Sequence, residues 1–191
     1  PSITYRGVDP DGDRFVPLDS DEEMTPAEVL ERHDTGEKYA DLVADFDRYP
    51  AIYDELGLFS FPPVINGRRT EVEAESRDLL IELTGTDQWT IDHVCNIICY
   101  ALSARGGTVE EVDIEYASAD AADDEYGATL VRPDFSVRTK QLDHDRIEIV
   151  LGVDLDQNTV LDLFERSGLS ASVDDDEEGT VYEVEIPPYR V

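Results

Sequence analysis

The chain has 191 residues, of which 40% are hydrophobic, and its 46 acidic and 15 basic residues give a formal net charge of −31. This composition excludes a disordered chain, because enough apolar and aromatic residues are present to build one domain, or one domain and a smaller second one. No apolar run approaches the roughly 18 residues of a membrane span, and no basic-then-apolar targeting segment opens the sequence.

The ends and the charge pattern suggest an origin. The first residue is Pro1 rather than methionine, and Val191 directly follows EIPPYR, so we expect a cytoplasmic fragment of a longer protein. The acidic residues are spread through every predicted helix and turn. Spread charge favours adaptation to molar salt, where the Debye length is about 3 Å, over an acidic protein that mimics or repels nucleic acid.

Helices dominate the first predicted elements. Residues 25–33 should form a helix, because Thr25-Pro26 with Glu28 makes a capping box. A second helix is predicted over 37–46, with an apolar face made of Tyr39, Leu42, Val43 and Phe46.

Strand signals follow. Residues 51–61 predict two strands joined by a turn through Asp54–Gly57. Asn66-Gly67, between strand-like flanks, predicts a further hairpin turn. The run DLLIELTGT, residues 78–86, is apolar without alternation and predicts a strand buried on both faces.

The longest helix is predicted over 88–105 and should stop at Gly106-Gly107. Residues 109–116 then alternate as a half-buried strand, and the small, acidic residues 118–128 predict a linker. The apolar stripe of the helix is Ile91, Val94, Cys95, Ile98 and Leu102.

A second small unit is predicted over 129–191. Its elements are a strand at 135–142, a short helix ending at Gly152, a helix at 158–168 and a hairpin at 169–186 with DDDEEG at its tip. The sequence therefore predicts an α+β fold. A mixed or antiparallel sheet with packed helices forms a domain over 1–117, followed by a small α+β domain that is incomplete at its C-terminus.

Common catalytic and metal-binding motifs are absent from the sequence. It contains no GxSxG, Walker loop, GxGxxG, HExxH or CxxC pair, and DPDGD at 9–13 lacks the Gly and Glu of a calcium loop. Cys95 and Cys99 are interpreted as small apolar residues on a helix face, since zinc would need further ligands. The histidines, His33, His93 and His144, are scattered over predicted helix surfaces without a local partner. We expect no metal or cofactor in this chain.

Two stretches mark a candidate pocket. FSFPPVING, residues 59–67, is stiffened by two prolines, and TGTD, residues 84–87, joins the predicted buried strand to the long helix. Backbone N–H groups at such a corner favour an anion or a polarised oxygen. The alternative is simple N-capping of the helix by Thr86 or Asp87. Together the stretches predict a pocket for a small polar ligand.

The chain resembles the beta subunit of phenylalanyl-tRNA synthetase, in its archaeal and eukaryotic form, through stretches that occur in the same order. They are GVDPDGDRFVPL, MTPAEVLERHDTGEKYADLV, YPAIYDELGLFSFPPVINGRRTEV, SRDLLIELTGTD and NIICYALSARGG. IVLGVDL, FERSGLS and VEIPPYR resemble the small domain that follows the editing module, so the resemblance covers essentially the whole chain. It implies that residues 1–117 are an amino-acid-editing domain, which hydrolyses tyrosine wrongly attached to tRNA(Phe).

The resemblance also implies roles for residues. Catalytic roles fall to Thr84, Thr86 and Asp87, which would bind the phenol, the α-amino group or the attacking water. Asp78 or Glu82 would accept the phenol's hydrogen bond, and the choice between them stays open. Substrate-binding roles fall to Phe59, Phe61, Pro62, Asn66, Asp78 and Glu82, and tRNA-binding roles to Arg68 and Arg69. The alternatives are core packing for the two phenylalanines and a turn role for Asn66.

The sequence departs from the family at several points. Asp78 stands where the family often has an amide. The family's magnesium ligands follow the PPYR segment, after the end of this chain, and the phenylalanine-activating site belongs to the alpha subunit. ATP and Mg2+ are therefore implied for the parent enzyme rather than for this chain. The implied partners are tRNA(Phe), the alpha subunit in a heterotetramer and the tyrosine moiety, with no membrane.

Two other functions compete with editing. The chain could be a non-catalytic piece that docks tRNA and scaffolds the subunits, with arginines as phosphate contacts. Those arginines are Arg68, Arg69, Arg132, Arg138 and Arg190. The chain could also be an acidic protein that only resembles the family and binds another protein.

Overall fold

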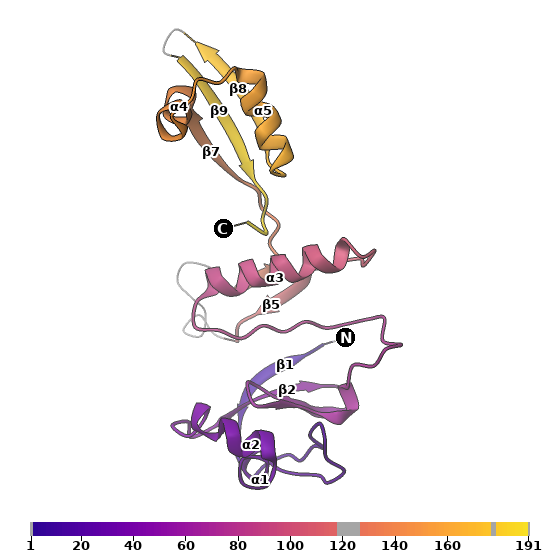
Figure 1. Ribbon diagram of the computed structural model, residues 1–191. Coiled ribbons are helices and arrows are strands. Elements are labelled where there is room, and N and C mark those ends of the chain that lie inside the picture. The colour runs from indigo at the N-terminus through magenta and orange to yellow at the C-terminus, as the bar shows by residue number, and fades with distance from the viewer. Residues whose placement is uncertain (1, 118–126, 177–178, 191) are drawn as a thin grey trace. The chain divides into compact units, whose positions relative to one another are not determined.

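The computed structural model describes residues 2–117, 127–176 and 179–190, which divide into two compact units, Pro1–Thr84 and Gly85–Val191. Both units combine helices with antiparallel sheets, so the predicted α+β fold is confirmed (Figure 1). The division lies at 84/85, whereas the sequence predicted domains over 1–117 and 129–191. The predicted linker, 118–128, falls mostly outside the described residues, and the strands on either side of it pair with each other.

The first unit is a four-stranded antiparallel sheet with two short helices. The strands lie in the order β1-β2-β3-β4, so β1 and β4 are the edges. The elements are β1 (Thr4–Val8), α1 (Pro26–Arg32), α2 (Asp34–Tyr39), η1 (Ala40–Leu42), β2 (Tyr49–Asp54), β3 (Gly57–Phe61), β4 (Ile65–Asn66) and η2 (Arg68–Thr70).

The capping box of α1 is confirmed. The Thr25 side chain accepts a hydrogen bond from the Glu28 N–H at 3.2 Å, and the Glu28 carboxylate accepts one from the Thr25 N–H at 2.9 Å. The helix predicted over 37–46 is wrong beyond Tyr39, because α2 ends there and only a short 3-10 turn, η1, follows. Of its predicted apolar face, Val43 is buried; Tyr39, Leu42 and Phe46 are exposed.

The hairpin turn predicted at Asn66-Gly67 is also wrong. The chain turns at residues 62–64, where the Val64 N–H donates to the Phe61 carbonyl, and Asn66 lies inside β4 opposite Ser60. Gly67 has an extended backbone, with φ −81° and ψ 149°. A Cβ there would lie 2.7 Å from the Phe59 carbonyl oxygen. This glycine therefore permits a close approach of two chain segments rather than a tight turn.

The core of the first unit lies between the sheet and the helices. Val29 of α1, Ala51 of β2 and Phe61 of β3 are fully buried in it. The rest of this cluster is Val8, Phe15, Met24, Val43, Leu58 and Val64. Packing against this core therefore fixes the backbone of β3 and β4, which carry Phe59 and Asn66.

The strand predicted over 78–86 is wrong for this chain. Residues 71–87 connect η2 to the next helix without a regular element, and none of the described backbone hydrogen bonds involves residues 78–84. Leu79 and Leu80 are 49% and 53% exposed. No described strand pairs with this apolar run.

The second unit begins with a long helix beside a hairpin. It comprises α3 (Gln88–Ser103), β5 (Val112–Glu115) and β6 (Thr129–Arg132). The helix ends as predicted, since Gly106 has a φ of +90°. The half-buried character predicted for 109–116 is wrong, because Val112 and Ile114 are both exposed. The predicted stripe of α3 is at most half-buried, and its buried residues are Asn96 and Cys99.

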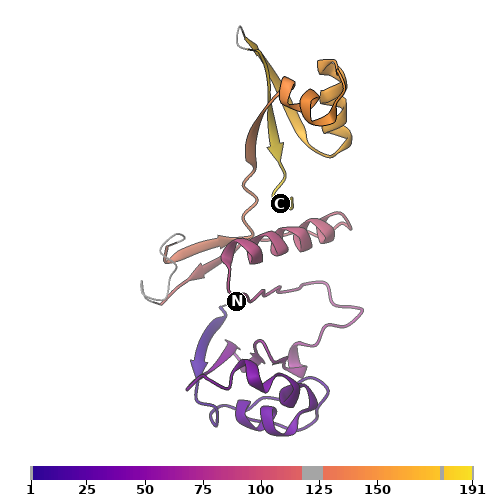
Figure 2. The same cartoon turned by 60° about the vertical axis from the view of Figure 1, so that its left-hand side comes forward.

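The C-terminal part matches its predicted elements. They are β7 (Arg138–Asp143), α4 (His144–Leu151), α5 (Gln157–Arg166), β8 (Ser170–Asp176) and β9 (Gly179–Ile186). The sheet order is β7-β9-β8, and α4 and α5 lie on the same face of it (Figure 2). Gly152 ends α4 in the left-handed conformation, as expected. Val160, Tyr182 and Val184 form the centre of this core.

The histidines have partners, contrary to the sequence prediction. His33 is buried; its Nδ1 accepts from the Thr35 N–H and so caps α2, and its Nε2 lies 2.8 Å from the Leu18 carbonyl. His144 lies 2.7 Å from the Tyr182 hydroxyl. Since these contacts satisfy the rings, the histidines serve the fold. No helix among the described residues is both long and apolar enough to cross a membrane.

Candidate functional site

The two phenylalanines predicted to bind the substrate differ in their exposure. Phe61 is fully buried and stacks on Tyr49, with ring centroids 5.6 Å apart. Pro62 is buried beside it. Phe59, two residues before Phe61 on β3, is half-buried. Of the residues predicted to contact the tyrosine ring, only Phe59 offers accessible surface in this chain, and Phe61 takes the core-packing alternative.

Asn66 is exposed at the edge of the sheet. Its Oδ1 accepts a hydrogen bond of 2.7 Å from the hydroxyl of Ser60, which lies directly opposite on β3 and is buried. This bond fixes the orientation of the amide, so the Asn66 side chain is held in place before any ligand arrives.

Both predicted tRNA-binding arginines form ion pairs within the first unit. Arg68 contacts the Asp21 carboxylate and donates to the Ser20 carbonyl at 3.1 Å. Arg69 binds Asp54 with two hydrogen bonds of 2.6 and 2.9 Å, and its guanidinium lies 5.7 Å from the centroid of the Phe59 ring. Arg68 and Arg69 therefore link η2 to residues elsewhere in the first unit.

The Asp54–Arg69 pair predicts an acid-sensitive contribution to stability. The hydrogen bonds from Arg69 hold the pKa of Asp54 at about 2, below the ordinary value near ~4. Because this folded-state pKa is depressed, the pair stabilises the fold above pH ~4, and that contribution is lost as the pH falls towards ~2. We expect Asp54→Asn to reduce the slope of unfolding free energy against pH in this window, measured by denaturant titration at fixed KCl. Glu55→Gln, at an exposed acid of the same turn, is the matched control, and an unchanged slope in Asp54→Asn would contradict the prediction.

The second group of predicted residues lies on the irregular segment before α3. Asp78, Glu82, Thr84 and Thr86 are all exposed. Although much of Glu82 is accessible, partial desolvation raises the pKa of its carboxyl group. The pKa of Tyr5 on β1 is raised by burial and also by the nearby negative charge of Glu82. A carboxylate of the segment and a phenol of the edge strand therefore lie within electrostatic reach of each other.

Asp87 has the capping role that the sequence offered as an alternative. It is the N-cap of α3, and its Oδ2 accepts from the Thr90 N–H at 2.8 Å and also contacts the Thr90 hydroxyl. These hydrogen bonds lower the pKa of Asp87. The carboxylate is thus engaged in starting the helix. Gly85 lies two residues before Asp87. A Cβ at this position would lie 2.5 Å from the Cγ2 atom of Ile91, so glycine permits this close approach.

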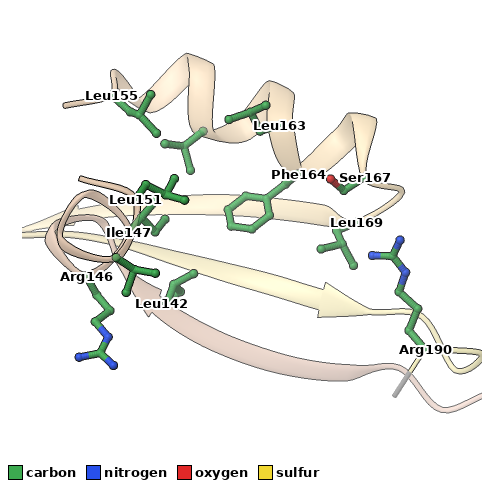
Figure 3. A pocket seen from close by; sticks show the side chains of 12 residues that line it. Leu142, Arg146, Ile147, Leu151, Leu155, Leu163, Phe164, Ser167, Leu169 and Arg190 are labelled. Carbon is green, nitrogen blue, oxygen red and sulfur yellow. The ribbon is translucent and has the colours of Figure 1, made fainter. Parts of the chain in front are cut away.

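Two cavities in the described part of the chain are lined by none of the predicted site residues. One, of about 480 Å³, lies between α4 and α5 and is lined mainly by leucine, isoleucine, valine and Phe164, with Arg146 and Arg190 at opposite ends (Figure 3). The other, of about 530 Å³, is lined by one face of α3 together with Phe135 and Tyr189. Among the described residues, no group of three or more His, Cys, Asp or Glu side chains is placed to hold a metal ion.

Sequence analysis missed the contacts that organise the second cavity. Asn96 donates from Nδ2 to the carbonyls of Asp134, at 2.9 Å, and Pro188, at 3.2 Å. Tyr100, one turn later, stacks on Tyr189 with ring centroids 4.0 Å apart. An asparagine between apolar residues of the predicted helix was a usable signal, but its partners, 38 and 92 residues away, could not be inferred from local pattern.

Sequence analysis also missed the protein partners of two arginines that were considered as phosphate contacts. Arg132 forms a half-buried ion pair of 2.7 Å with Asp92 of α3. Arg138 donates to the backbone carbonyl of Arg190 at 2.7 Å. Both guanidinium groups therefore have protein partners in the second unit.

Comparison with known proteins identifies the family. Residues 140–191 match the family described as the tRNA synthetase B5 domain. The chain is 67% identical over 191 residues to the phenylalanine–tRNA ligase beta subunit of Halorubrum lacusprofundi, and 38% identical over 193 residues to that of Methanocaldococcus jannaschii. Each alignment covers 100% of this chain and 33% of the relative. The beta subunit of Haloarcula marismortui is 65% identical over 190 residues, covering 100% of this chain and 32% of the relative.

A solved structure agrees. The crystal structure of an N-terminal fragment of the phenylalanyl-tRNA synthetase beta-subunit from Pyrococcus horikoshii matches with a TM-score of 0.80 at 25% identity, covering 100% of this chain and 52% of that one. The relatives from Halorubrum and Haloarcula also fit the predicted salt adaptation. The chain spans about a third of the length of these curated relatives. It belongs to the family of phenylalanine–tRNA ligase beta subunits.

Proposed function

We propose that this chain forms part of the amino-acid-editing site of a phenylalanine–tRNA ligase beta subunit and takes part in hydrolysing tyrosine wrongly attached to tRNA(Phe). The observation that supports this best is the position of Glu82. It lies on an exposed segment, two residues before Thr84, its pKa is raised, and its charge reaches the phenol of Tyr5. A carboxylate with a perturbed pKa and a phenol within its electrostatic reach is suited to accept the hydroxyl hydrogen of a tyrosine substrate.

Editing is needed because the synthetic site discriminates poorly between phenylalanine and tyrosine. A pocket shaped for the phenylalanine ring rejects the extra hydroxyl of tyrosine by only about a hundred-fold. A second site with a fixed acceptor for that hydroxyl rejects phenylalanine by roughly 10⁴ or more, because the acceptor is left without a partner. Glu82 fits this acceptor role better than Asp78, since the negative charge of Glu82 acts on the phenol of Tyr5 and raises its pKa.

The remaining residues would position the ester. Phe59, half-buried on β3, offers an apolar surface to the ring, and the fixed amide of Asn66 offers a polar contact at the sheet edge. Thr84 and Thr86 would bind the α-amino group or the attacking water. Asp87 would act through the start of α3, whose backbone N–H groups it orders.

The chemical step is an ordinary ester hydrolysis. A positioned water attacks the carbonyl carbon, and backbone N–H donors stabilise the oxyanion of the tetrahedral intermediate. The bond to the ribose oxygen breaks, that oxygen takes up a proton, and free tyrosine and tRNA(Phe) leave. The vicinal ribose hydroxyl relays the proton lost by the water, since no predicted site residue is placed as a general base.

The partners follow from this proposal. The substrate is mischarged tRNA(Phe), and the parent enzyme contains an alpha subunit that activates phenylalanine with ATP and Mg2+ in the cytoplasm. Because Arg68, Arg69 and Arg132 are already paired with aspartates, tRNA contacts by these side chains would require exchange of those pairs.

Deacylation of tyrosyl-tRNA(Phe) by the full alpha–beta enzyme in high KCl tests the proposal. We expect Glu82→Gln to slow hydrolysis roughly ten- to a hundred-fold, the range for losing a charged hydrogen bond, and also to reduce the preference over phenylalanyl-tRNA(Phe). Thr84→Ala and Thr86→Ala should slow hydrolysis of both esters. Thr139→Ala, at an exposed threonine of β7, is the matched control.

The outcomes separate the competing functions. Wild-type rates in all three site variants would overturn the residue assignment. Absence of deacylation in the wild-type enzyme, with tRNA affinity intact, would favour a docking and scaffolding piece. Failure to bind either tRNA or an alpha subunit would instead indicate another protein as the partner.

A further inference from the structure

Residues 79–81 place three large apolar side chains in succession at the surface. Leu79 and Leu80 are about half exposed, and Ile81 is 38% exposed. These side chains are consecutive, so in an extended chain they point to both faces. Such a run matches a strand covered on both sides by other layers. It also lies in a chain of net charge −31, whose other surfaces are rich in carboxylates.

Within the described part of the chain, the backbone of this run also has no hydrogen-bond partner. None of the described backbone hydrogen bonds involves residues 78–84, and the segment is drawn without an arrow or helix between η2 and α3 (Figures 1 and 2). An extended apolar run without inter-strand hydrogen bonds exposes both its side chains and its amide groups. Such a segment can pair with another strand, as the edge strand of a sheet does.

A second open edge lies nearby. β1 is the edge strand of the first sheet, and no described strand pairs with its outer side. Residues 4–7 of β1 are exposed, including Tyr5. The negative charge of Glu82 contributes to the raised pKa of Tyr5, so the Glu82 carboxylate lies within electrostatic reach of this edge. Two open strand-like edges of one unit therefore run in the same neighbourhood.

The relatives show where a covering strand can come from. The chain aligns over its whole length with beta subunits of which it represents about a third, so most of a beta subunit lies outside these residues. A strand from the same subunit is present at high effective concentration. A second copy of this chain would bring another 31 negative charges to the contact.

We infer that residues 78–83 are a β-strand of the full subunit, which pairs with a strand contributed by the part of the same beta subunit outside residues 1–191. Pairing would place Leu79, Ile81 and Leu83 on one face of the completed sheet and Asp78, Leu80 and Glu82 on the other. The inference holds whether or not the subunit edits, because it rests on packing and hydrogen bonding alone.

Hydrogen exchange of the full alpha–beta enzyme tests the pairing. We expect the amides of residues 79–83 to exchange at least about a hundred-fold more slowly than an unstructured chain, as in a stable ladder. Leu80→Asp should remove this protection. Leu56→Asp, at an 81% exposed position in the β2–β3 turn, is the matched control and should preserve it. Exchange within about ten-fold of the unstructured rate in the wild-type enzyme would overturn the inference.

Cross-linking identifies the covering strand. A short dihydrazide linker, applied to the wild-type enzyme in which labelled and unlabelled beta subunits are mixed, should join Asp78 or Glu82 to a peptide of the same subunit outside residues 1–191. Linkage to the alpha subunit, or between labelled and unlabelled beta subunits, would overturn the assignment to the same chain. This result does not depend on deacylation activity, so it can fail or succeed independently of the editing proposal.

Discussion

Phe61→Ala is expected to lower the unfolding free energy of the first unit by about 3–5 kcal/mol, the usual cost of removing a buried phenylalanine ring. Phe61 is fully buried, stacks on Tyr49 and lies where β3, α1 and the loop after η1 meet. Denaturant unfolding of residues 1–191 in fixed high KCl, followed by circular dichroism, measures the change. The loss would leave a cavity that the surrounding strands cannot fill.

Phe46→Ala is the matched control, because that ring is 57% exposed. Its effect should stay within about 0.5 kcal/mol. The comparison also separates two roles for Phe61. If Phe61→Ala unfolds normally but slows deacylation, the ring contacts substrate as the family resemblance implied. If stability falls as expected, any loss of editing follows from a disturbed β3.

Gly36→Ala is expected to destabilise the same unit by about 3 kcal/mol or more, the upper part of the range for overpacking. A Cβ at this position would lie 1.9 Å from the Val29 carbonyl oxygen, so α1 and α2 could not keep their present spacing. Val29 is fully buried and cannot move without disturbing the core. For a unit of this size we expect the melting temperature to fall by roughly 12 °C or more.

Differential scanning calorimetry in high KCl measures this shift. Glu37→Ala, at the exposed neighbouring position of α2, is the control and should change the melting temperature by only about 2 °C. A melting temperature for Gly36→Ala equal to that of the wild type would mean that the two helices are not in close contact.

Local signals in the sequence were read correctly where the contacts are local. Thr25 with Glu28, and Gly152 after α4, fix helix ends through hydrogen bonds or backbone conformations that span a few residues. The Asn66-Gly67 pair misled the prediction, since it resembles a hairpin turn. Its glycine instead allows the chain to pass close to Phe59, a contact that no turn rule describes.

The apolar run at 78–86 failed for a different reason. Its pattern predicts a strand covered on both faces, but the described chain provides no layer for either face. An apolar pattern predicts that both faces of a segment are covered, but it does not identify the residues that cover them. The exposed strand β5 and the partly covered α3 show the same limitation.

The candidate site was predictable mainly through the family resemblance. Residue types and spacing placed Thr84–Asp87 at the start of the long helix, and the structure has that helix begin after Asp87. The pairing of Arg69 with Asp54, and the reach of Glu82 to Tyr5, depend on how distant segments fold together. Composition could not reveal these long-range interactions.

The asparagine of α3 joins two distant parts of the second unit. The Nδ2 group of Asn96 donates to two backbone carbonyls, one before β7 and one just after β9. Because β7 begins and β9 ends at the same end of the antiparallel C-terminal sheet, a single side chain anchors that end of the sheet to α3. The helix begins after Asp87, so the element that anchors the sheet also carries the last of the candidate site residues at its N-cap.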